Sequence, residues 1–156
     1  MRRRFLLLGA LALVATASPA HADEEAKRLL EGIYKSYTGS PAAGLDYHSE
    51  AKARRTFTPD TVRLFARDWR EAKGEVGRLG FDPFVNGQDY EVTAYTVLVE
   101  ETGPDQARAT VQMTNLGKRQ TVVHDLARTA NGWRIHDIRW PGTKGSLRTI
   151  LSRPAI

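Results

Sequence analysis

Two aspartates and two tyrosines carry the chemistry that the chain could most readily perform. Asp137 and Asp89 are candidate general bases, and the hydroxyl of Tyr34 or Tyr37 is a candidate hydrogen-bond donor to an oxyanion. A carboxylate removed from water has a raised pKa and can accept a proton, while a phenol stabilises the negative charge that develops on a neighbouring oxygen. Together they would carry out an isomerisation or an elimination.

Asp137 is open to a second interpretation. In the alternating sequence of residues 133–139 it shares a face with Trp133 and Ile135, both good core residues, and His136 points the other way, toward solvent. An aspartate on that face is either a partly buried acid or an anchor near the end of a strand. The arginines available as its partners are Arg134, Arg139 and Arg148. We favour the anchor.

A polar loop with the sequence FDPFVNGQD, residues 81–89, precedes the predicted sheet. Its side chains that could present acceptors and amide donors to a ligand are Asp82, Asn86, Gln88 and Asp89. The alternative, which we favour, is that Asp-Pro and Asn-Gly are turn sequences whose side chains bond their own backbone. Phe81 and Phe84 would then fill the core.

His124 alternates with Val122 and Leu126, so it is predicted to lie on the core side of its strand. A lone histidine there is more often a hydrogen-bonded core residue than a catalyst. His48 and His136 form no H-x-H or H-x-x-x-H pair with it, and the chain has no cysteine. We therefore predict neither a metal site nor a cofactor.

The sequence contains neither a nucleophile motif nor a glycine loop of the phosphate-binding kind. Gly74, Gly77 and Gly80 follow a predicted helix instead of opening one, which is typical of a connector. Tyr34, Tyr37 and Trp69 could line a pocket, although aromatic residues at helical spacing are usually core. No complete catalytic set is present, so we expect binding rather than catalysis.

The first 22 residues have the three parts of a cleavable signal peptide. Three arginines, Arg2 to Arg4, precede an apolar run over residues 5–17, and Ala20-His21-Ala22 is a small-x-small cleavage site. A membrane helix needs about 20 apolar residues, more than this run supplies. We expect cleavage after Ala22 and a periplasmic or secreted product with no stable membrane insertion. The arginines fit both the general and the twin-arginine export routes.

Charge argues against a nucleic-acid partner. Three of the 23 basic residues lie in the signal segment, which leaves 20 against 18 acidic residues in the mature chain. These charges are interspersed, whereas nucleic-acid binding needs a clustered basic face. Residues 23–156 suit a single domain with one core.

Hydrophobic spacing predicts helices first and an antiparallel sheet afterwards. Thr58 and Pro59 are typical of an N-cap followed by the first helical residue, and Ser146 of a second N-cap. In the first strand, Val92, Ala94, Thr96 and Leu98 alternate with Glu91, Thr93, Tyr95 and Val97; in the second, Ala107, Ala109, Val111 and Met113 share a face. The predicted elements are a helix over 23–37, a loop or short helix within 42–57, a helix over 59–72, strands from 88, 107, 121 and 133, and a helix over 146–151. This order predicts an α+β fold in which the helices cover one face of the sheet.

Four stretches resemble the DUF3828 family, small exported bacterial proteins of unknown function near the NTF2-like (cystatin-like) superfamily. They are IYKSY at the end of the first helix, FDPFVNGQD, GWRIHDI in the last strand and SLRTIL in the last helix. The resemblance implies an NTF2-like cone, with N-terminal helices packed on a curved antiparallel sheet of about four strands and a short C-terminal helix. It implies no activity, because one fold hosts many functions.

Three functions remain open at this point. The first is non-enzymatic binding of a small ligand or an envelope protein in a pocket between helices and sheet. The second is a ketosteroid isomerase-like enzyme that uses Asp137 or Asp89 as base. The third is an inhibitor or immunity-type interaction protein. Relatives of this shape also pair through the open sheet face, so a homodimer is compatible with each.

Overall fold

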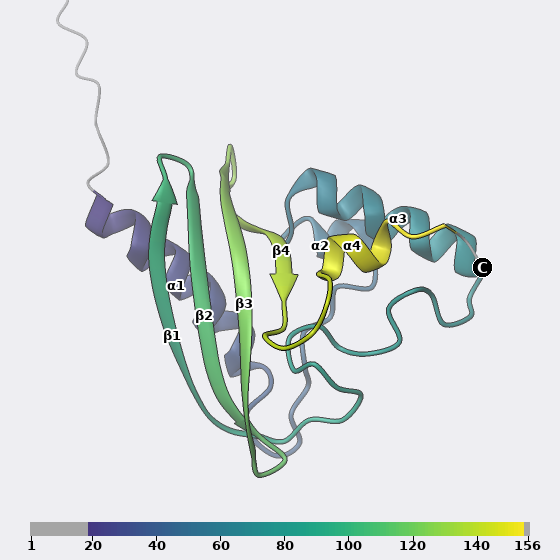
Figure 1. Ribbon diagram of the computed structural model, residues 1–156, viewed down its shortest axis with the longest axis horizontal. Helices are drawn as coiled ribbons and strands as arrows, with labels where there is room; N and C mark the ends of the chain where they lie inside the picture. Colours follow the sequence, from purple (N-terminus) through teal and green to yellow (C-terminus); the bar gives the residue numbers. More distant parts are fainter. Residues whose placement is uncertain (1–18, 155–156) are drawn as a thin grey trace, which may run out of the picture.

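The computed structural model describes residues 19–154, and the predicted signal segment lies outside them as far as Ser18. The elements follow in the order α1 (Pro19–Lys35), α2 (Glu50–Ala53), α3 (Pro59–Ala72), β1 (Val92–Gly103), β2 (Gln106–Asn115), β3 (Lys118–Thr129), β4 (Gly132–Arg139) and α4 (Leu147–Leu151). Figure 1 shows the long helices beside one sheet. The predicted α+β class is confirmed.

Helix α1 begins at Pro19, before the predicted start at residue 23, and proline is well suited to a first helical turn. The acidic residues from Asp23 to Glu25 open the predicted helix, but in the structure they lie beyond its first turn. Its buried side consists of Ala26, Leu30, Ile33 and Tyr34. This apolar stripe packs against the sheet, with β1 as its main neighbour.

Helix α3 has the predicted bounds, with Thr58 as N-cap and Pro59 in the first turn. The Thr58 hydroxyl does not cap the helix; it lies 3.1 Å from the Thr61 hydroxyl and 3.3 Å from His136 Nδ1. Backbone bonds on either side of Phe57 tie this segment to β4, since Thr58 N–H donates to Ile135 O and Ile135 N–H donates to Thr56 O. The start of α3 is therefore fixed to the last strand.

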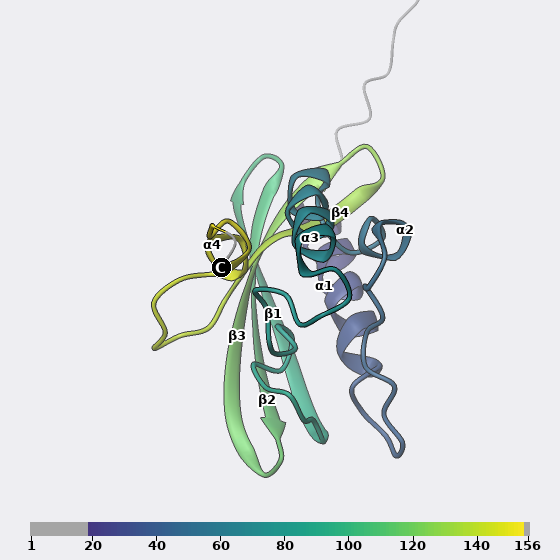
Figure 2. The same ribbon diagram turned by 90° about the vertical axis from the view of Figure 1, so that its right-hand side faces the viewer.

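The strands form one sheet in the order β1-β2-β3-β4, and each pairs antiparallel with the next, as the sequence predicts. The side of β2 that carries Ala107, Ala109, Val111 and Met113 is buried, as its strict alternation predicts. Figure 2 shows that the long strands are bent and that α1 and α3 lie on the same side of them. The core lies between that side of the sheet and these helices.

The predicted alternation fails in β1. The strand begins at Val92, not at residue 88, and its pairing with β2 is irregular between Val92 and Ala94. An extra residue in one strand reverses the faces that follow it. Val92 is buried, but farther along Tyr95 and Val97 face the core and Leu98 is 61% exposed.

Helix α4 packs against α3 and β4. Its N-cap is Ser146, whose hydroxyl accepts a hydrogen bond from Thr149 N–H at 3.2 Å, as predicted. Within residues 19–154, no helix combines the length and apolar character needed to cross a bilayer.

Candidate functional site

The space between the helices and the sheet is filled with aromatic rings instead of enclosing a hollow. Phe84 is fully buried at its centre, with ring centroids 5.9–6.3 Å from its neighbours. Those neighbours are Tyr34, Tyr37, Tyr47, Phe57 and His124. Five surface pockets of residues 19–154 are lined by other side chains, except that Phe57 also lines one of them. The packed rings leave little space in this interior for the expected ligand pocket.

Tyr34 and His124 form a buried polar chain within this core. The Tyr34 hydroxyl donates to Phe84 O at 2.9 Å and lies 2.9 Å from His124 Nε2. His124 Nε2 must then carry the hydrogen that it donates to the Tyr34 oxygen, which leaves Nδ1 as a bare acceptor with no partner among residues 19–154. Burial lowers the pKa of His124 to about 3. His124 is thus a neutral, hydrogen-bonded core histidine.

Tyr37 meets a carboxylate from the 81–89 loop. Its hydroxyl donates to Asp82 Oδ2 at 2.7 Å, and Asp82 Oδ1 accepts Phe84 N–H at 2.9 Å. Burial is the main cause that raises the pKa of Asp82, and burial together with the Asp82 charge raises the pKa of Tyr37. These two groups hold the loop against the segment that follows α1, where the ring of Tyr37 packs against Phe84 and Tyr90.

The other residues proposed for a site in this loop lie at the surface. Asn86, Gln88 and Asp89 are exposed, and Gln88 Nε2 donates to Gly80 O at 3.1 Å. Asn86 has a φ of 49°, a turn conformation that asparagine tolerates well. Trp69 stacks on Phe65 with centroids 5.5 Å apart. The structural interpretation of these residues fits the geometry.

Asp137 does not share a core face with Trp133 and Ile135. Leu126 pairs with Ile135 but Asp125 pairs with Asp137, so His136 is the extra residue of a bulge and the faces reverse. His136 is partly buried, not fully solvent-facing. Asp137 Oδ1 accepts Ile138 N–H and Arg148 N–H, each at 2.9 Å. It anchors the first turn of α4 and lines a surface pocket together with Ser146 and Arg148.

Replacing Asp137 with alanine should lower the free energy of unfolding by about 1 kcal/mol, because the first turn of α4 loses an acceptor. Urea unfolding followed by circular dichroism measures the change. Asp137→Asn keeps an acceptor oxygen at the same place and should lose less. Equal losses in the two variants would contradict the anchoring role.

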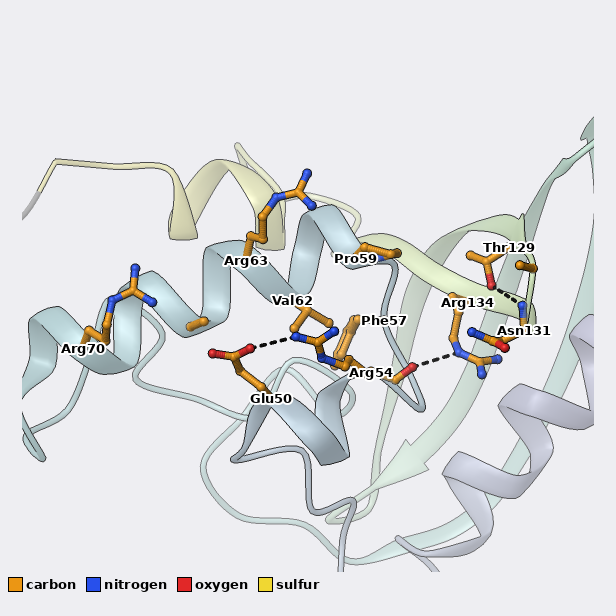
Figure 3. Close-up of a pocket in the computed structure, with 12 residues that line it drawn as sticks. Glu50, Arg54, Phe57, Pro59, Val62, Arg63, Arg70, Thr129, Asn131 and Arg134 are labelled. Carbon is orange, nitrogen blue, oxygen red and sulfur yellow. Dashed lines mark hydrogen bonds and ion pairs between the residues drawn. The ribbon is translucent and has the colours of Figure 1, made fainter.

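A groove that the sequence did not reveal lies between α2, α3 and the turn that joins β3 to β4. Its volume is about 600 Å³. Figure 3 shows α3 along one side, α2 opposite and Asn131 and Arg134 at one end. The lining residues are Glu50, Arg54, Phe57, Pro59, Val62, Arg63, Ala66, Arg70, Thr129, Ala130, Asn131 and Arg134. Small-molecule sites are of this size, from about 300 to 1,000 Å³.

One face of α3 supplies much of the groove. Pro59, Val62, Arg63, Ala66 and Arg70 recur at helical spacing, so they form a single stripe. Val62 and Ala66 are nearly buried and make an apolar floor, while the two arginines form the rim. Phe57 continues the floor where the chain enters α3.

The groove is lined by four arginines and a single carboxylate, Glu50. Arg54 pairs with Glu50 at 3.0 Å, and Arg63 pairs with Asp60, which does not line the groove. Within residues 19–154, Arg70 and Arg134 form no ion pair. The lining is therefore positive and suits an anion.

Arg134 is the most firmly placed of these cations. Its Nε donates to Arg54 O at 3.0 Å and its Nη1 donates to Trp133 O at 2.7 Å. These bonds fix the plane of the guanidinium and leave Nη2 available. Asn131 lies beside it (Figure 3), at the turn before β4. A guanidinium with a fixed plane is well suited to bind a carboxylate or a phosphate.

Part of this site carries a signal in the sequence. Arg63 and Arg70 are seven residues apart in a predicted helix, and Ala66 lies between them at helical spacing, so a basic rim on α3 could have been found. The junction of Arg54 with Arg134 joins positions 80 residues apart and depends on the pairing of residues 56–58 with β4. Within residues 19–154, no group of three or more acidic or histidine side chains could hold a metal ion.

No protein-family model and no curated protein matches the chain. Among solved structures, it is similar to a phospholipid-binding protein from Ralstonia solanacearum, determined in complex with a phospholipid. The TM-score is 0.44, the sequences are 14% identical, and the match covers 83% of each chain. So distant a likeness says nothing of a ligand, and the function has to be inferred from the groove itself.

Proposed function

We propose that the protein is an exported, non-enzymatic binding protein whose groove between α2 and α3 takes a small anionic molecule with an apolar part. The fixed guanidinium of Arg134, which has no ion-pair partner within residues 19–154, is the observation that carries the proposal. Arginine binds carboxylates and phosphates alike, so the shared chemistry of the ligand is an oxyanion.

The apolar part of the ligand would lie on the floor formed by Phe57, Val62 and Ala66. These side chains are almost entirely buried, so the apolar surface that they offer to a ligand is small. An acyl chain or an aromatic ring removes such a surface from water at a gain of about 25 cal/mol per Å². Charge would fix the orientation of the ligand, and apolar contact would add affinity.

Export through the signal peptide of residues 1–22 would deliver residues 23–156 as one domain to the periplasm. The DUF3828 resemblance is part of this proposal, and it agrees with an exported protein for which no activity is expected. Catalysis is not part of it, because none of the candidate bases faces a cavity together with a tyrosine hydroxyl.

Arg134→Gln should weaken the binding of octanoate about tenfold, because a charged hydrogen bond of about 1.5 kcal/mol is lost. Isothermal titration calorimetry with the mature chain measures this. Acetate and 1-octanol test the charge and the chain separately, and each should bind more weakly than octanoate. Octyl phosphate and inorganic phosphate distinguish an amphiphilic ligand from a free anion.

Arg28→Gln is the matched control, since Arg28 is exposed on α1 and does not line the groove. It should bind octanoate as the wild type does. Equal losses in the two variants would mean that the anion binds through general charge and would contradict a site at Arg134. If octanoate binds no better than acetate, the apolar floor contributes nothing to binding and that part of the proposal is wrong.

A further inference from the structure

Glu50 is the one acidic side chain in an otherwise basic groove lining, and the proposed function gives it no role. It is the first residue of α2, after the N-cap Ser49. Its Oε2 accepts a hydrogen bond from Arg54 Nη2 at 3.0 Å, one helical turn farther along. Figure 3 shows this pair facing α3 across the groove. The groove thus contains a carboxylate of its own.

We propose that Glu50 is an internal competitor, which occupies on Arg54 the place that the oxyanion of the ligand takes when it binds. The inference rests on the proposed function, since it assigns a role to a residue of the same groove. Glu50 Oε2 engages Arg54 Nη2, and a ligand carboxylate that takes the same donor must displace it.

Replacing Glu50 by a ligand carboxylate on Arg54 costs little free energy, because the Glu50–Arg54 pair is exposed. The side chains of Glu50 and Arg54 are 52% and 67% exposed, and the Arg54–Glu50 bond is the only one recorded for the Glu50 carboxylate within residues 19–154. An exposed ion pair of this kind contributes little to stability. Arg54 O meanwhile stays bonded to Arg134 Nε, so the backbone that carries Arg54 remains in place.

Glu50 also repels an anion bound at Arg134. The Arg54–Arg134 bond brings the two arginines to the same end of the groove, and Glu50 contacts one of them. The Glu50 side chain is 52% exposed, so solvent weakens this repulsion and it adds only modestly to the competition at Arg54. Removing the Glu50 charge should therefore free Arg54 and lessen this repulsion at once.

The test compares the wild type with Glu50→Gln, using octanoate and calorimetry. We expect Glu50→Gln to bind octanoate about three- to tenfold more tightly, because one competitor and one repulsive charge are gone. Glu24→Gln is the matched control; Glu24 is exposed on α1 and lies outside the groove lining, so its loss should leave the affinity unchanged. Melting temperatures establish that both variants are folded.

A double variant separates competition at Arg54 from simple repulsion. In an Arg54→Gln background, Glu50→Gln should give a smaller gain than in the wild type, since part of its effect passes through Arg54. A full gain in that background would overturn the exchange.

The remaining outcomes distinguish this inference from the proposed function. If Arg134→Gln weakens binding but Glu50→Gln changes nothing, the site stands and the competitor is refuted. If Glu50→Gln weakens binding, Glu50 contacts a cationic part of the ligand and the inference is again overturned. If octanoate and octyl phosphate bind to neither the wild type nor Glu50→Gln, the proposed function fails and this inference with it.

Discussion

Phe84→Ala is expected to lower the free energy of unfolding by about 3–5 kcal/mol, the usual cost of removing a buried phenylalanine ring. Phe84 is 0% exposed and stacks on His124 with centroids 5.9 Å apart and planes 22° apart. Tyr37, Tyr47 and Phe57 approach it at 6.0 Å from other sides. These rings come from different segments and cannot all move inward, so a cavity remains.

The backbone of Phe84 increases this cost. Its N–H donates to Asp82 Oδ1 and its carbonyl accepts the Tyr34 hydroxyl. A loop that shifts to fill the cavity would strain both bonds, and buried polar groups that lose a partner are destabilising. The loss should therefore lie toward the upper end of the range.

Leu98→Ala is the matched control, because Leu98 is a large apolar residue that is 61% exposed on β1. Urea unfolding should place it within about 0.5 kcal/mol of the wild type. A loss below about 1 kcal/mol for Phe84→Ala would show that the interior is loosely filled. That result would restore the internal hollow, and with it the case for a ligand at Tyr34 and Tyr37.

The rings around Phe84 show which features of the structure can be predicted from the sequence. His124 was predicted to be a hydrogen-bonded core histidine because it alternates with Val122 and Leu126 along a strand that is regular at that point. The buried side of β2 follows from local periodicity in the same way, and the start of α3 from Pro59 in its first turn. Local sequence patterns therefore predict the buried faces correctly where the pairing of the strands is regular.

Two irregularities account for what the sequence could not predict. The bulge at His136 turns Asp137 from the core to the first turn of α4, and the one near Val92 exposes Leu98. A bulge is a property of two strands in register, so one strand read alone does not reveal it. The groove arises for a similar reason, because residues 56–58 must pair with β4 before Arg54 can meet Arg134.

His124 leads to the second large effect, a loss of stability in acid. Lowering the pH from 7 to 5 should remove about 2 kcal/mol from the free energy of unfolding, with a slope of about 1.4 kcal/mol per pH unit below pH 6.5. The ordinary pKa of histidine is 6.5, and burial lowers the pKa of His124 to about 3 in the folded chain. The unfolded chain thus binds the extra proton first. The stability is complete above pH 6.5 and decreases as the pH falls toward 3.

Asp82 acts in the opposite direction. Burial raises the pKa of its carboxyl, so the folded chain binds that proton more readily and regains stability as the pH falls through the raised value. The measurement should therefore compare the wild type with His124→Gln between pH 7 and pH 5, since the difference between the two cancels every other titrating group. The wild type should lose about 2 kcal/mol more than the variant.

Nuclear magnetic resonance gives a second reading if His124→Gln does not fold. The imidazole signals of His124 should not shift between pH 7 and pH 4, because the ring stays neutral while the chain is folded. The hydrogen on His124 Nε2 is the one donated to the Tyr34 oxygen. If the signal of this hydrogen persists over the same pH range, the assignment of the hydrogen bond is confirmed. A titration midpoint near 6.5 would show that water reaches Nδ1, and the close packing of rings around Phe84 would then be wrong as well.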